Sequence, residues 1–287
     1  MSGAVGFIGL GNIGAPMATR LLAWPGGLVV HDVRPEACDP YVAKGATAAA
    51  TPAQVASAAD VISVMVQNEQ QVREVLSGPD GILAAAGPQT VVAVHSTISA
   101  EGAVALAALA ADAGVALVDA PVSGGAMGAH EGTLAIMIGG SEAAVDRCRE
   151  PFALMGTLLA HFGPVGSGTN AKITRNLITF ASFAVVGEAQ RLAAAAGLDL
   201  AKLGDVVRHS DRITGGAGAV MLRSSADRMA DDDGLRPIFE HTATLGAKDL
   251  HLAVHLAAEH GLGAPFAELG ERWLRTALGL DAAPESP

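Results

Sequence analysis

Apolar and polar positions alternate between two patterns along the first part of the chain. Short apolar runs, typical of buried parallel strands, are each followed by a segment with apolar residues at helical spacing. The first run contains Val5, Phe7 and Ile8. Further strands are predicted at Leu28–Asp32, Ala46–Ala48, Val61–Val66, Val91–His95, Val115–Asp119, Leu134–Ile138 and Leu158–Phe162. This β-α alternation predicts an α/β fold with a doubly wound, mainly parallel sheet.

The pattern changes after Gly163, where no further strand-like run is found. The glycine-rich segment Gly163–Gly168 marks the change. Helices are predicted beyond it at Thr169–Ala196, Leu200–Arg208, Ala217–Met229, Thr242–His260 and Pro265–Leu278. We therefore predict one domain over residues 1–163 and a second, all-helical domain over residues 164–287.

The first strand ends in a G-x-G-x-x-G turn, Gly9-Leu10-Gly11-Asn12-Ile13-Gly14, and a helical pattern follows it. Gly9 allows the tight turn, Gly11 lets a pyrophosphate approach the backbone, and Gly14 lets the helix pack closely on the strand. Asp32 ends the next apolar run, where a contact with a ribose hydroxyl is expected. The motif alone would be weak in a chain with 35 glycines. Its strand, helix and acidic residue together predict a Rossmann-type dinucleotide-binding domain.

Composition limits the classes of partner and compartment. The net charge of −11 argues against nucleic acid as a partner, because phosphate binding needs a basic face. Cys38 and Cys148 are the two cysteines and lie far apart, which favours the reducing cytoplasm and no disulfide framework. A strand beginning close to Met1 leaves no room for a signal peptide. No apolar run approaches the ~20 residues of a membrane span, so no membrane contact is expected.

Two polar segments follow predicted strands at the edge where ligands bind in an open parallel sheet. In Asp119-Ala120-Pro121-Val122-Ser123-Gly124-Gly125, the serine hydroxyl and glycine N–H groups suit a carboxylate, although an ordinary loop is equally compatible. In His95-Ser96-Thr97, Thr97 is a candidate contact for a nicotinamide ring. A helix-capping role for Ser96 or Thr97 fits the local sequence equally well.

Lys172 and Asn176 begin the first predicted helix of the second domain and share one face of it. Arg175 lies near that face, so a polar stripe at a glycine-rich segment points into a cleft. An isolated lysine is more often a solvated surface residue, and Lys248-Asp249 by itself is compatible with a surface ion pair.

No metal site is predicted. The acidic run Asp231–Asp233 is interpreted as a solvated loop, and the pair His251 and His255 lacks the glutamate of a zinc protease motif.

Taken together, the motifs resemble the β-hydroxyacid dehydrogenase family, which includes 3-hydroxyisobutyrate dehydrogenase and tartronate semialdehyde reductase. The family start G-x-G-x-M-G-x-P-M-A fits Gly9–Ala18, with Ile13 in place of the first Met, and D-x-P-V-S-G-G fits Asp119–Gly125. The signature G-x-x-G-x-G-x-x-x-K-x-x-x-N fits Gly163–Asn176, and K-D-L fits Lys248–Leu250. The resemblance covers nearly the whole chain.

This resemblance implies hydride transfer between a nicotinamide cofactor and a small 3-hydroxy acid or its semialdehyde. It implies that Lys172 is the general acid/base, with Asn176 and Ser123 as the other catalytic residues. The implied substrate-binding residues are Ser123, Gly124, Gly125, Lys172, Arg175 and Asn176. The implied cofactor-binding residues are Gly9, Leu10, Gly11, Asn12, Ile13, Gly14, Asp32, Val33, Arg34, Val66, Gln67, Gln71, Thr97 and Lys248.

The sequence departs from the family pattern at several positions. Arg175 replaces the first of two asparagines that often follow the lysine, and Gln71 replaces another asparagine. These changes predict a more polar substrate than hydroxyisobutyrate, unless Arg175 points to solvent or to the cofactor. Asp32-Val33-Arg34 stands where NADP-using relatives often have Asn-Arg-Thr. NAD is therefore the expected cofactor, with NADP as the alternative.

Three other functions are weighed. Imine reductases of similar fold lack the catalytic lysine, and a phosphogluconate-type enzyme would need a longer chain and a basic cluster. A non-enzymatic cofactor-binding protein would have no need of Lys172, Asn176 and Ser123 together. The predicted helix Thr169–Ala196 is apolar over much of its surface and needs covering, which predicts a homodimer or homotetramer through the second domain.

Overall fold

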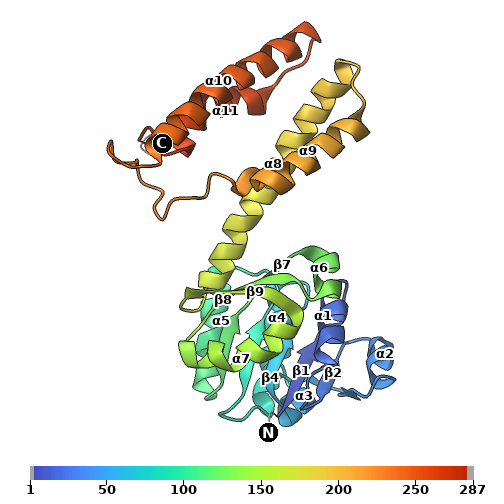
Figure 1. Ribbon diagram of the computed structural model, residues 1–287. Helices are drawn as coiled ribbons and strands as arrows, with labels where there is room; N and C mark the ends of the chain where they lie inside the picture. The colour runs from blue at the N-terminus through green and yellow to red at the C-terminus, as the bar shows by residue number, and fades with distance from the viewer. Residues whose placement is uncertain (1–2, 283–287) are drawn as a thin grey trace. The chain divides into compact units, whose positions relative to one another are not determined.

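A computed structural model describes residues 3–282 of the chain (Figure 1). The chain divides into two compact units within one long helix, the first ending at Asn176 and the second beginning at Leu177. The boundary predicted after Gly163 stays a prediction. By this division, the first turns of the long helix belong to the first unit.

The first unit is built on a single sheet. Its strands are β1 (Ala4–Ile8), β2 (Leu28–His31), β3 (Thr47–Ala48), β4 (Ala59–Val64), β5 (Val91–Val94), β6 (Ala116–Asp119), β7 (Val122–Ser123), β8 (Leu134–Gly139) and β9 (Gly156–Gly163). The strand order is β3-β2-β1-β4-β5-β6-β8-β7, with β9 paired to β8. The pairs from β3 to β6 are parallel, while β6 and β7 each pair antiparallel with β8. The predicted doubly wound, mainly parallel sheet is confirmed.

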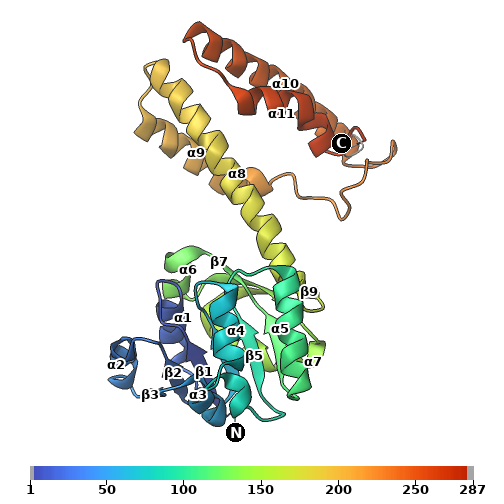
Figure 2. The same ribbon diagram turned by 180° about the vertical axis from the view of Figure 1, so that it is seen from behind.

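Helices cover both faces of this sheet. They are α1 (Gly14–Leu21), α2 (Asp39–Val42), α3 (Pro52–Ala58), α4 (Glu69–Ser77), α5 (Ala100–Asp112), α6 (Gly125–Glu131) and α7 (Glu142–Met155). One core lies between the sheet and helices α1 and α7, and a second lies between the sheet and helices α3, α4 and α5. Figure 2 shows α4 and α5 on the near face of the sheet.

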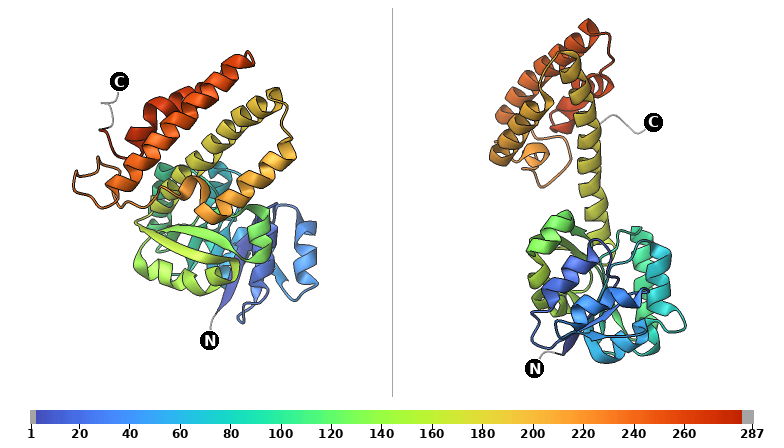
Figure 3. Two further views of the ribbon diagram at one scale, coloured as in Figure 1. Left: turned by 45° about the horizontal axis from the view of Figure 1, so that its top comes forward. Right: turned by 90° about the vertical axis from the view of Figure 1, so that its right-hand side faces the viewer.

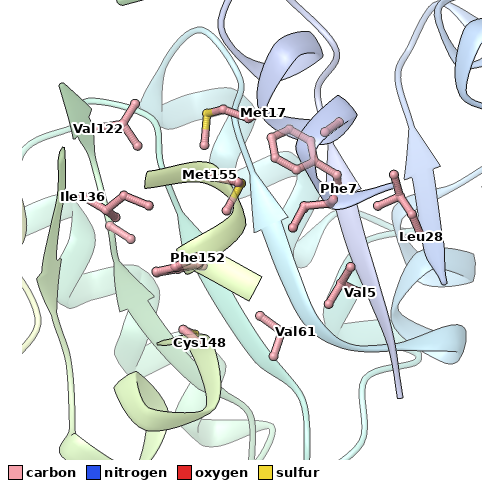
Figure 4. Close-up of a cluster of buried hydrophobic side chains, with 14 of the residues drawn as sticks. Val5, Phe7, Met17, Leu28, Val61, Val122, Ile136, Cys148, Phe152 and Met155 are labelled. Carbon is pink, nitrogen blue, oxygen red and sulfur yellow. The ribbon is translucent and has the colours of Figure 1, made fainter. Parts of the chain in front are cut away.

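Alternation along the strands supplies both cores. In β1, Val5 and Phe7 belong to the first core, whereas Ile8 belongs to the second. Figure 4 shows the first core, where Phe7 and Met17 lie near Met155 of α7. Because successive side chains of a strand point to opposite faces, two layers of helices can be packed on one sheet.

Among its described residues, the second unit has helices and irregular chain but no strand. It contains the rest of α8 (Ser167–Ala195), α9 (Leu200–Thr214), α10 (Arg236–Glu259) and α11 (Pro265–Ala277). Figure 3 shows α10 and α11 side by side. The buried carboxylate of Glu188 on α8 accepts hydrogen bonds from the backbone N–H groups of Phe266 and Ala267, both at 3.0 Å, and so caps α11. The predicted all-helical character of this part is confirmed.

The helix predicted at Ala217–Met229 is wrong. A short 3₁₀ helix, Gly216–Gly218, is followed by irregular chain up to α10, which begins at Arg236. Gly215 and Gly216 adopt positive φ values of 90° and 56° and end α9. The guanidinium of Arg223 donates to the carbonyl of Asp227, which holds the irregular segment in place.

Two elements between β6 and β8 replace a predicted glycine-rich loop. They are the short strand β7 and helix α6, joined through Gly124 and Gly125. Both glycines have positive φ, 133° and 64°, which lets the chain turn directly from strand to helix. The residues that the sequence suggested for carboxylate binding, Ser123, Gly124 and Gly125, therefore lie at the end of a strand and the start of a helix.

Candidate active site

A cavity of about 840 Å³ lies where β1, β2 and β4 end. It is lined by Ile8, Gly9, Gly11, Asn12, Ile13, Gly14, His31, Asp32, Val33, Arg34, Pro52, Met65, Val66, Gln67, Gln71, Glu74 and Val75. Most residues predicted to bind the cofactor are in this set. The cavity lies at the carboxyl ends of parallel strands, where open α/β sheets bind their ligands.

The glycine turn has the geometry that a pyrophosphate requires. Gly9 has a φ of 97°, and a side chain there would collide with the carbonyl of Met65. A side chain at Gly14 would collide with the carbonyl of Gly9, so this glycine allows helix α1 to pack closely on the turn. Gly11 is exposed, and no atom of the described residues outside its own neighbours lies within 4 Å of where its Cβ would be. The turn therefore leaves room for phosphates at the start of α1.

Asp32 is buried, with 8% of its surface exposed, and is held from two sides. Its Oδ2 accepts the backbone N–H of Leu10 at 2.7 Å, and its Oδ1 accepts the backbone N–H and Nε–H of Arg34 at 2.9 and 3.1 Å. Burial alone would raise the pKa of Asp32. The hydrogen bonds from Arg34 and Leu10 and the Arg34 charge outweigh it and hold the pKa below its usual value. An ionised carboxylate at this position suits ribose hydroxyls and disfavours a 2′-phosphate.

Some predicted cofactor residues do not line the cavity. Leu10 is buried and contributes its N–H to Asp32. Thr97 is exposed after β5. Lys248 lies on α10 in the second unit, where its Nζ is 2.8 Å from Asp249 Oδ1. Contact of Thr97 and Lys248 with the cofactor stays a prediction.

Several lining residues were missed. Glu74 and Val75 follow Gln71 on α4 by three and four residues, so helical periodicity places them on one face with it. That spacing could have identified them. Pro52 of α3 gave no such signal, because its position depends on how α3 packs beside β2.

The segment His95-Ser96-Thr97 does not cap a helix. Ser99 is the N-cap of α5, since its Oγ accepts the N–H of Gly102 at 2.9 Å. Ser96 is buried and exchanges hydrogen bonds with the backbone N–H and carbonyl of Val66, at 2.9 and 2.8 Å. It therefore ties the end of β5 to the end of β4 beside the cavity.

His95 directly follows β5 and is buried, with 1% of its surface exposed. Its Nδ1 is 2.7 Å from the carbonyl oxygen of Ala120, and its Nε2 is 3.0 Å from Ser63 Oγ. A carbonyl only accepts, so Nδ1 carries the proton and Nε2 accepts from Ser63. Burial lowers the pKa of His95 to about 4, although the hydrogen bond to Ala120 acts in the opposite direction.

Lys172 contacts the segment Asp119–Gly125 through a hydrogen bond. The half-buried Nζ of Lys172 donates a hydrogen bond of 2.7 Å to the carbonyl of Val122, the residue before Ser123. The alternative of a solvated surface lysine is therefore wrong. Burial lowers the pKa of Lys172 below its ordinary value, and the positive charge of Arg175 lowers it further. Arg175 is exposed and Asn176 is half-buried one turn beyond Lys172.

The beginning of α8 is anchored to the same segment. The carboxylate of Asp119, which is fully buried at the end of β6, accepts the N–H of Gly166 at 2.8 Å and the N–H of Thr169 at 2.6 Å. A strand end thus caps the helix that carries Lys172. The candidate substrate residues and the candidate acid/base are held together by contacts within the first unit.

The glycine-rich turn, the ionised Asp32 and the cavity define a dinucleotide-binding domain. Residues 4–163 match the family model described as the NAD binding domain of 6-phosphogluconate dehydrogenase. Residues 166–284 match the model described as "NAD-binding of NADP-dependent 3-hydroxyisobutyrate dehydrogenase". The chain belongs to the β-hydroxyacid dehydrogenase family.

Individual proteins agree with this assignment. An uncharacterized oxidoreductase of Mycobacterium tuberculosis is 51% identical over 276 residues, which cover 96% of this chain and 93% of that protein. An NAD-dependent L-serine dehydrogenase of Pseudomonas aeruginosa is 36% identical over 267 residues, covering 92% and 89% of the two chains. The crystal structure of an oxidoreductase from Mycobacterium avium 104 has a TM-score of 0.92 at 45% identity, covering 96% of this chain and 98% of that one. The protein is an NAD(P)-dependent oxidoreductase that acts on a small molecule with a CH–OH group.

The buried His95 predicts a pH-dependent loss of stability. Its folded-state pKa of about 4 lies below the ordinary value of 6.5, so between these values the unfolded state binds more protons. The free energy of unfolding should fall as pH falls from 6.5 to 4, by about 3 kcal/mol from this group. Urea unfolding at several pH values should show a shallower dependence for His95→Asn, which keeps a donor toward Ala120. Equal slopes in the two proteins would contradict the prediction.

The Asp32 site predicts cofactor preference. We expect a higher kcat/KM with NAD than with NADP, because the Asp32 charge repels a 2′-phosphate. Asp32→Asn should raise the ratio of kcat/KM with NADP to kcat/KM with NAD by about 10-fold or more. The reason is that placing the Asp32 carboxylate next to a 2′-phosphate, two negative charges, costs several kcal/mol. Glu36→Gln, an exposed carboxylate outside the cavity, is the matched control and should leave the ratio unchanged. A wild-type preference for NADP would show this interpretation of Asp32 to be wrong.

Proposed function

We propose that this enzyme oxidises a small 3-hydroxy acid, or reduces the matching semialdehyde, with Lys172 as the general acid/base. The observation that carries the proposal is the 2.7 Å hydrogen bond from Lys172 Nζ to the carbonyl of Val122. This contact brings the amine beside Ser123, Gly124 and Gly125, which have the donors for a carboxylate. A nicotinamide cofactor, which the glycine turn and Asp32 would hold, would accept a hydride in the oxidation and donate one in the reduction.

The substrate carboxylate binds to the Ser123 hydroxyl and to the N–H groups of Gly124 and Gly125. Gly124 is the N-cap of α6, and the first N–H groups of a helix have no partner within the helix. A bound carboxylate satisfies these donors and orients the substrate. Asn176, one turn after Lys172, holds the substrate or the lysine in position.

Lys172 moves the proton. In the oxidation it takes the proton of the substrate hydroxyl on Nζ as the carbonyl forms, and in the reduction it returns that proton to the oxygen. An ordinary lysine is almost fully protonated near neutrality and is a poor base. Burial and the neighbouring Arg175 charge lower its pKa, which increases the neutral fraction that can accept a proton.

Arg175 narrows the class of substrate. It follows Lys172 by three residues on α8, a spacing that allows it to face the same side of the helix. A guanidinium there favours a second carboxylate or a hydroxylated tail, which it binds through paired N–H groups. We therefore favour polar 3-hydroxy acids over hydroxyisobutyrate. The catalytic lysine also favours a hydroxyacid dehydrogenase over an imine reductase or a non-enzymatic cofactor-binding protein.

We propose further that a second copy of the chain covers the exposed apolar surface of the helical unit. Large apolar side chains remain exposed on all four helices, including Phe180 and Phe183 of α8 at 62% and 63%. On α10, Ile238, Leu245 and Leu252 are exposed at intervals of seven residues, the spacing of a helix-packing stripe. On α11, Phe266, Leu269 and Trp273 form a matching stripe. Apolar surface of this extent marks an interface, and its repetition on helices of one unit favours a homodimer or homotetramer.

Helix α8 was predicted from the sequence, but it is also long and apolar enough to cross a membrane by length and composition, which was not expected. Its mean hydropathy reaches 1.2 over an 18-residue window, of which 11% is buried. We attribute this exposed apolar surface to subunit contact. We place the enzyme in the cytoplasm, where its two buried, unpaired cysteines would stay reduced. Because the net charge is −11, we expect no nucleic-acid partner.

Replacement of Lys172 tests the function. A panel of 3-hydroxy acids and semialdehydes, including L-serine, 3-hydroxyisobutyrate and hydroxylated dicarboxylates, first identifies the best substrate by absorbance of the reduced cofactor. Lys172→Met should lower kcat on that substrate by at least ~10²-fold, because proton transfer by a positioned group is typically worth ~10²–10⁴-fold. The rise of the oxidation rate with pH, expected below the ordinary lysine pKa, should disappear.

The exposed Lys202 provides the control. Lys202→Met should keep the wild-type kcat, and both variants should keep the melting temperature and the affinity for NADH measured by fluorescence. A folded Lys172→Met enzyme with most of its kcat would remove the proposed acid/base. Absence of activity across the whole panel would reject the substrate class.

Light scattering tests the covering copy. In detergent-free buffer at micromolar concentration we expect a mass of at least twice the 28.7 kDa of one chain. Leu252→Glu, in the stripe of α10, should shift the mass toward the monomer, since it places a charge in an apolar interface. Ala258→Glu, at an exposed position on the same helix outside the stripe, should not. A monomeric wild type, or recovery only with detergent, would reject the proposed oligomer.

A further inference from the structure

Asp119 joins two elements that are far apart in the sequence. Its side chain is fully buried at the end of β6 and accepts from two N–H groups, one of the residue before α8 and one in the first turn of α8. Oδ1 accepts from Gly166 at 2.8 Å and Oδ2 accepts from Thr169 at 2.6 Å. Both oxygens are therefore committed to the beginning of the helix that carries Lys172.

A carboxylate is well suited to this position. The first N–H groups of α8 have no partner within the helix, and the positive end of the helix dipole favours a negative charge there. The surrounding space is small, because a side chain at Gly139 or at Gly168 would collide with atoms around Asp119. The strand end and the helix start can approach this closely only with glycine at both positions.

Two kinds of contact attach the beginning of α8. The N–H groups of Gly166, the residue before the helix, and of Thr169 in its first turn bind the Asp119 carboxylate, which fixes the position of the helix start along its axis. One turn further on, Nζ of Lys172 reaches sideways to the carbonyl of Val122, which fixes the side of α8 that faces the segment from Asp119 to Val122. The attachment sets both the rotation and the height of the helix relative to Ser123.

The segment that receives α8 is itself held firmly. The N–H of Ala120 donates to the carbonyl of Val94 at 2.8 Å, and the carbonyl of Ala120 accepts from His95 at 2.7 Å. The carbonyl of Pro121 accepts the N–H of Met137 at 3.0 Å. The segment from Asp119 to Val122 therefore does not follow a shift of α8. If the hydrogen bonds to Asp119 are weakened, α8 shifts and the distance between Lys172 and this segment changes.

We infer that Asp119 is a positioning residue for Lys172: by capping α8 with both carboxylate oxygens, it fixes where the lysine amine lies relative to the substrate-binding Ser123. This inference rests on the proposed role of Lys172. It assigns to Asp119 no contact with substrate or cofactor.

Asp119→Asn tests the inference with little change of shape. The amide retains one acceptor oxygen but turns an NH₂ group toward a backbone N–H, and the negative charge is lost. We expect kcat to fall by ~10-fold or more, since a misplacement of about 1 Å can cost ~10²-fold in rate. The KM for NAD and the affinity for NADH should stay unchanged, because the cofactor cavity lies at the ends of other strands.

A second readout does not depend on activity. The chain has four lysines, Lys44, Lys172, Lys202 and Lys248, so the rate of acylation by an amine-reactive reagent can be followed at each by peptide mapping. In Asp119→Asn we expect Lys172 to be labelled several-fold faster than in the wild type, because its amine leaves the Val122 carbonyl. Labelling of the other three lysines should not change.

Asp199→Asn is the matched control. Asp199 is the N-cap of α9 and accepts the N–H groups of Ala201 and Lys202 at 2.9 and 3.1 Å, so the same chemical change is made at another helix start. This variant should change the melting temperature little, because asparagine caps a helix about as well as aspartate, and kcat and the labelling of Lys172 should stay at the wild-type values. A cap at Asp119 that serves only stability would likewise leave kcat and the labelling of Lys172 unchanged.

The outcomes separate the two proposals. If Asp119→Asn lowers only the melting temperature, with kcat and Lys172 labelling unchanged, the positioning role is refuted. If the wild type turns over no compound of the panel, the proposed function fails, and the labelling still decides the position of Lys172. If Asp119→Asn does not fold, amide exchange of the wild type decides: slow exchange at Gly166 and Thr169 supports the cap, and rapid exchange overturns it.

Discussion

A single buried carboxylate connects the sheet of this enzyme to its longest helix. Asp119 ends β6, and its two oxygens accept the N–H groups of Gly166, just before α8, and of Thr169 in its first turn. Without this cap, N–H groups at a buried helix start would lack partners, at a cost of roughly 1–3 kcal/mol each. The same contact carries α8 to the place where its lysine meets Val122. Stability of the fold and geometry of the site thus depend on one group.

The cofactor side of the site depends on a different kind of constraint. At the glycine turn the requirement is absence of side chains, because backbone atoms of Gly9, Gly14 and Met65 approach too closely for a Cβ. At Asp32 the requirement is a charge that survives burial, and hydrogen bonds from Leu10 and Arg34 supply it. Local backbone geometry and local charge therefore define the dinucleotide site, whereas long-range contacts define the substrate site.

This difference explains which features could be predicted from the sequence. The turn, Asp32 and the β-α alternation are local patterns, and the structure has the expected sheet and places these residues around one cavity. The roles of Asp119 and His95 depend on partners far along the chain, at Gly166 and Ala120, and no spacing rule identifies such pairs. Their geometry came only from the structure.

The errors also have local causes. The segment after α9 has apolar residues at helical spacing, but Gly215 and Gly216 in left-handed conformations end the helix before it. Strand β7 and helix α6 are too short for periodicity to reveal. The contacts of Lys248, Asn176 and Thr97 with ligand remain predictions. The boundary after Gly163, which was predicted from the change in sequence pattern, also remains one.

The division of the chain within α8 has a consequence for protein engineering. Lys172, Arg175 and Asn176 all precede Leu177, so the turn that carries the proposed acid/base belongs to the same compact unit as the glycine turn and Ser123. Gene fusions that exchange the helical unit after Asn176 would therefore transfer a new set of helices without disturbing the Asp119 cap or the lysine. Fusions made at the glycine-rich segment Gly163–Gly168 would instead replace the turn of Lys172 together with the helices. In a chimeric library, a junction inside the helix keeps Lys172 with its Asp119 cap, and a junction at the glycine-rich segment separates them.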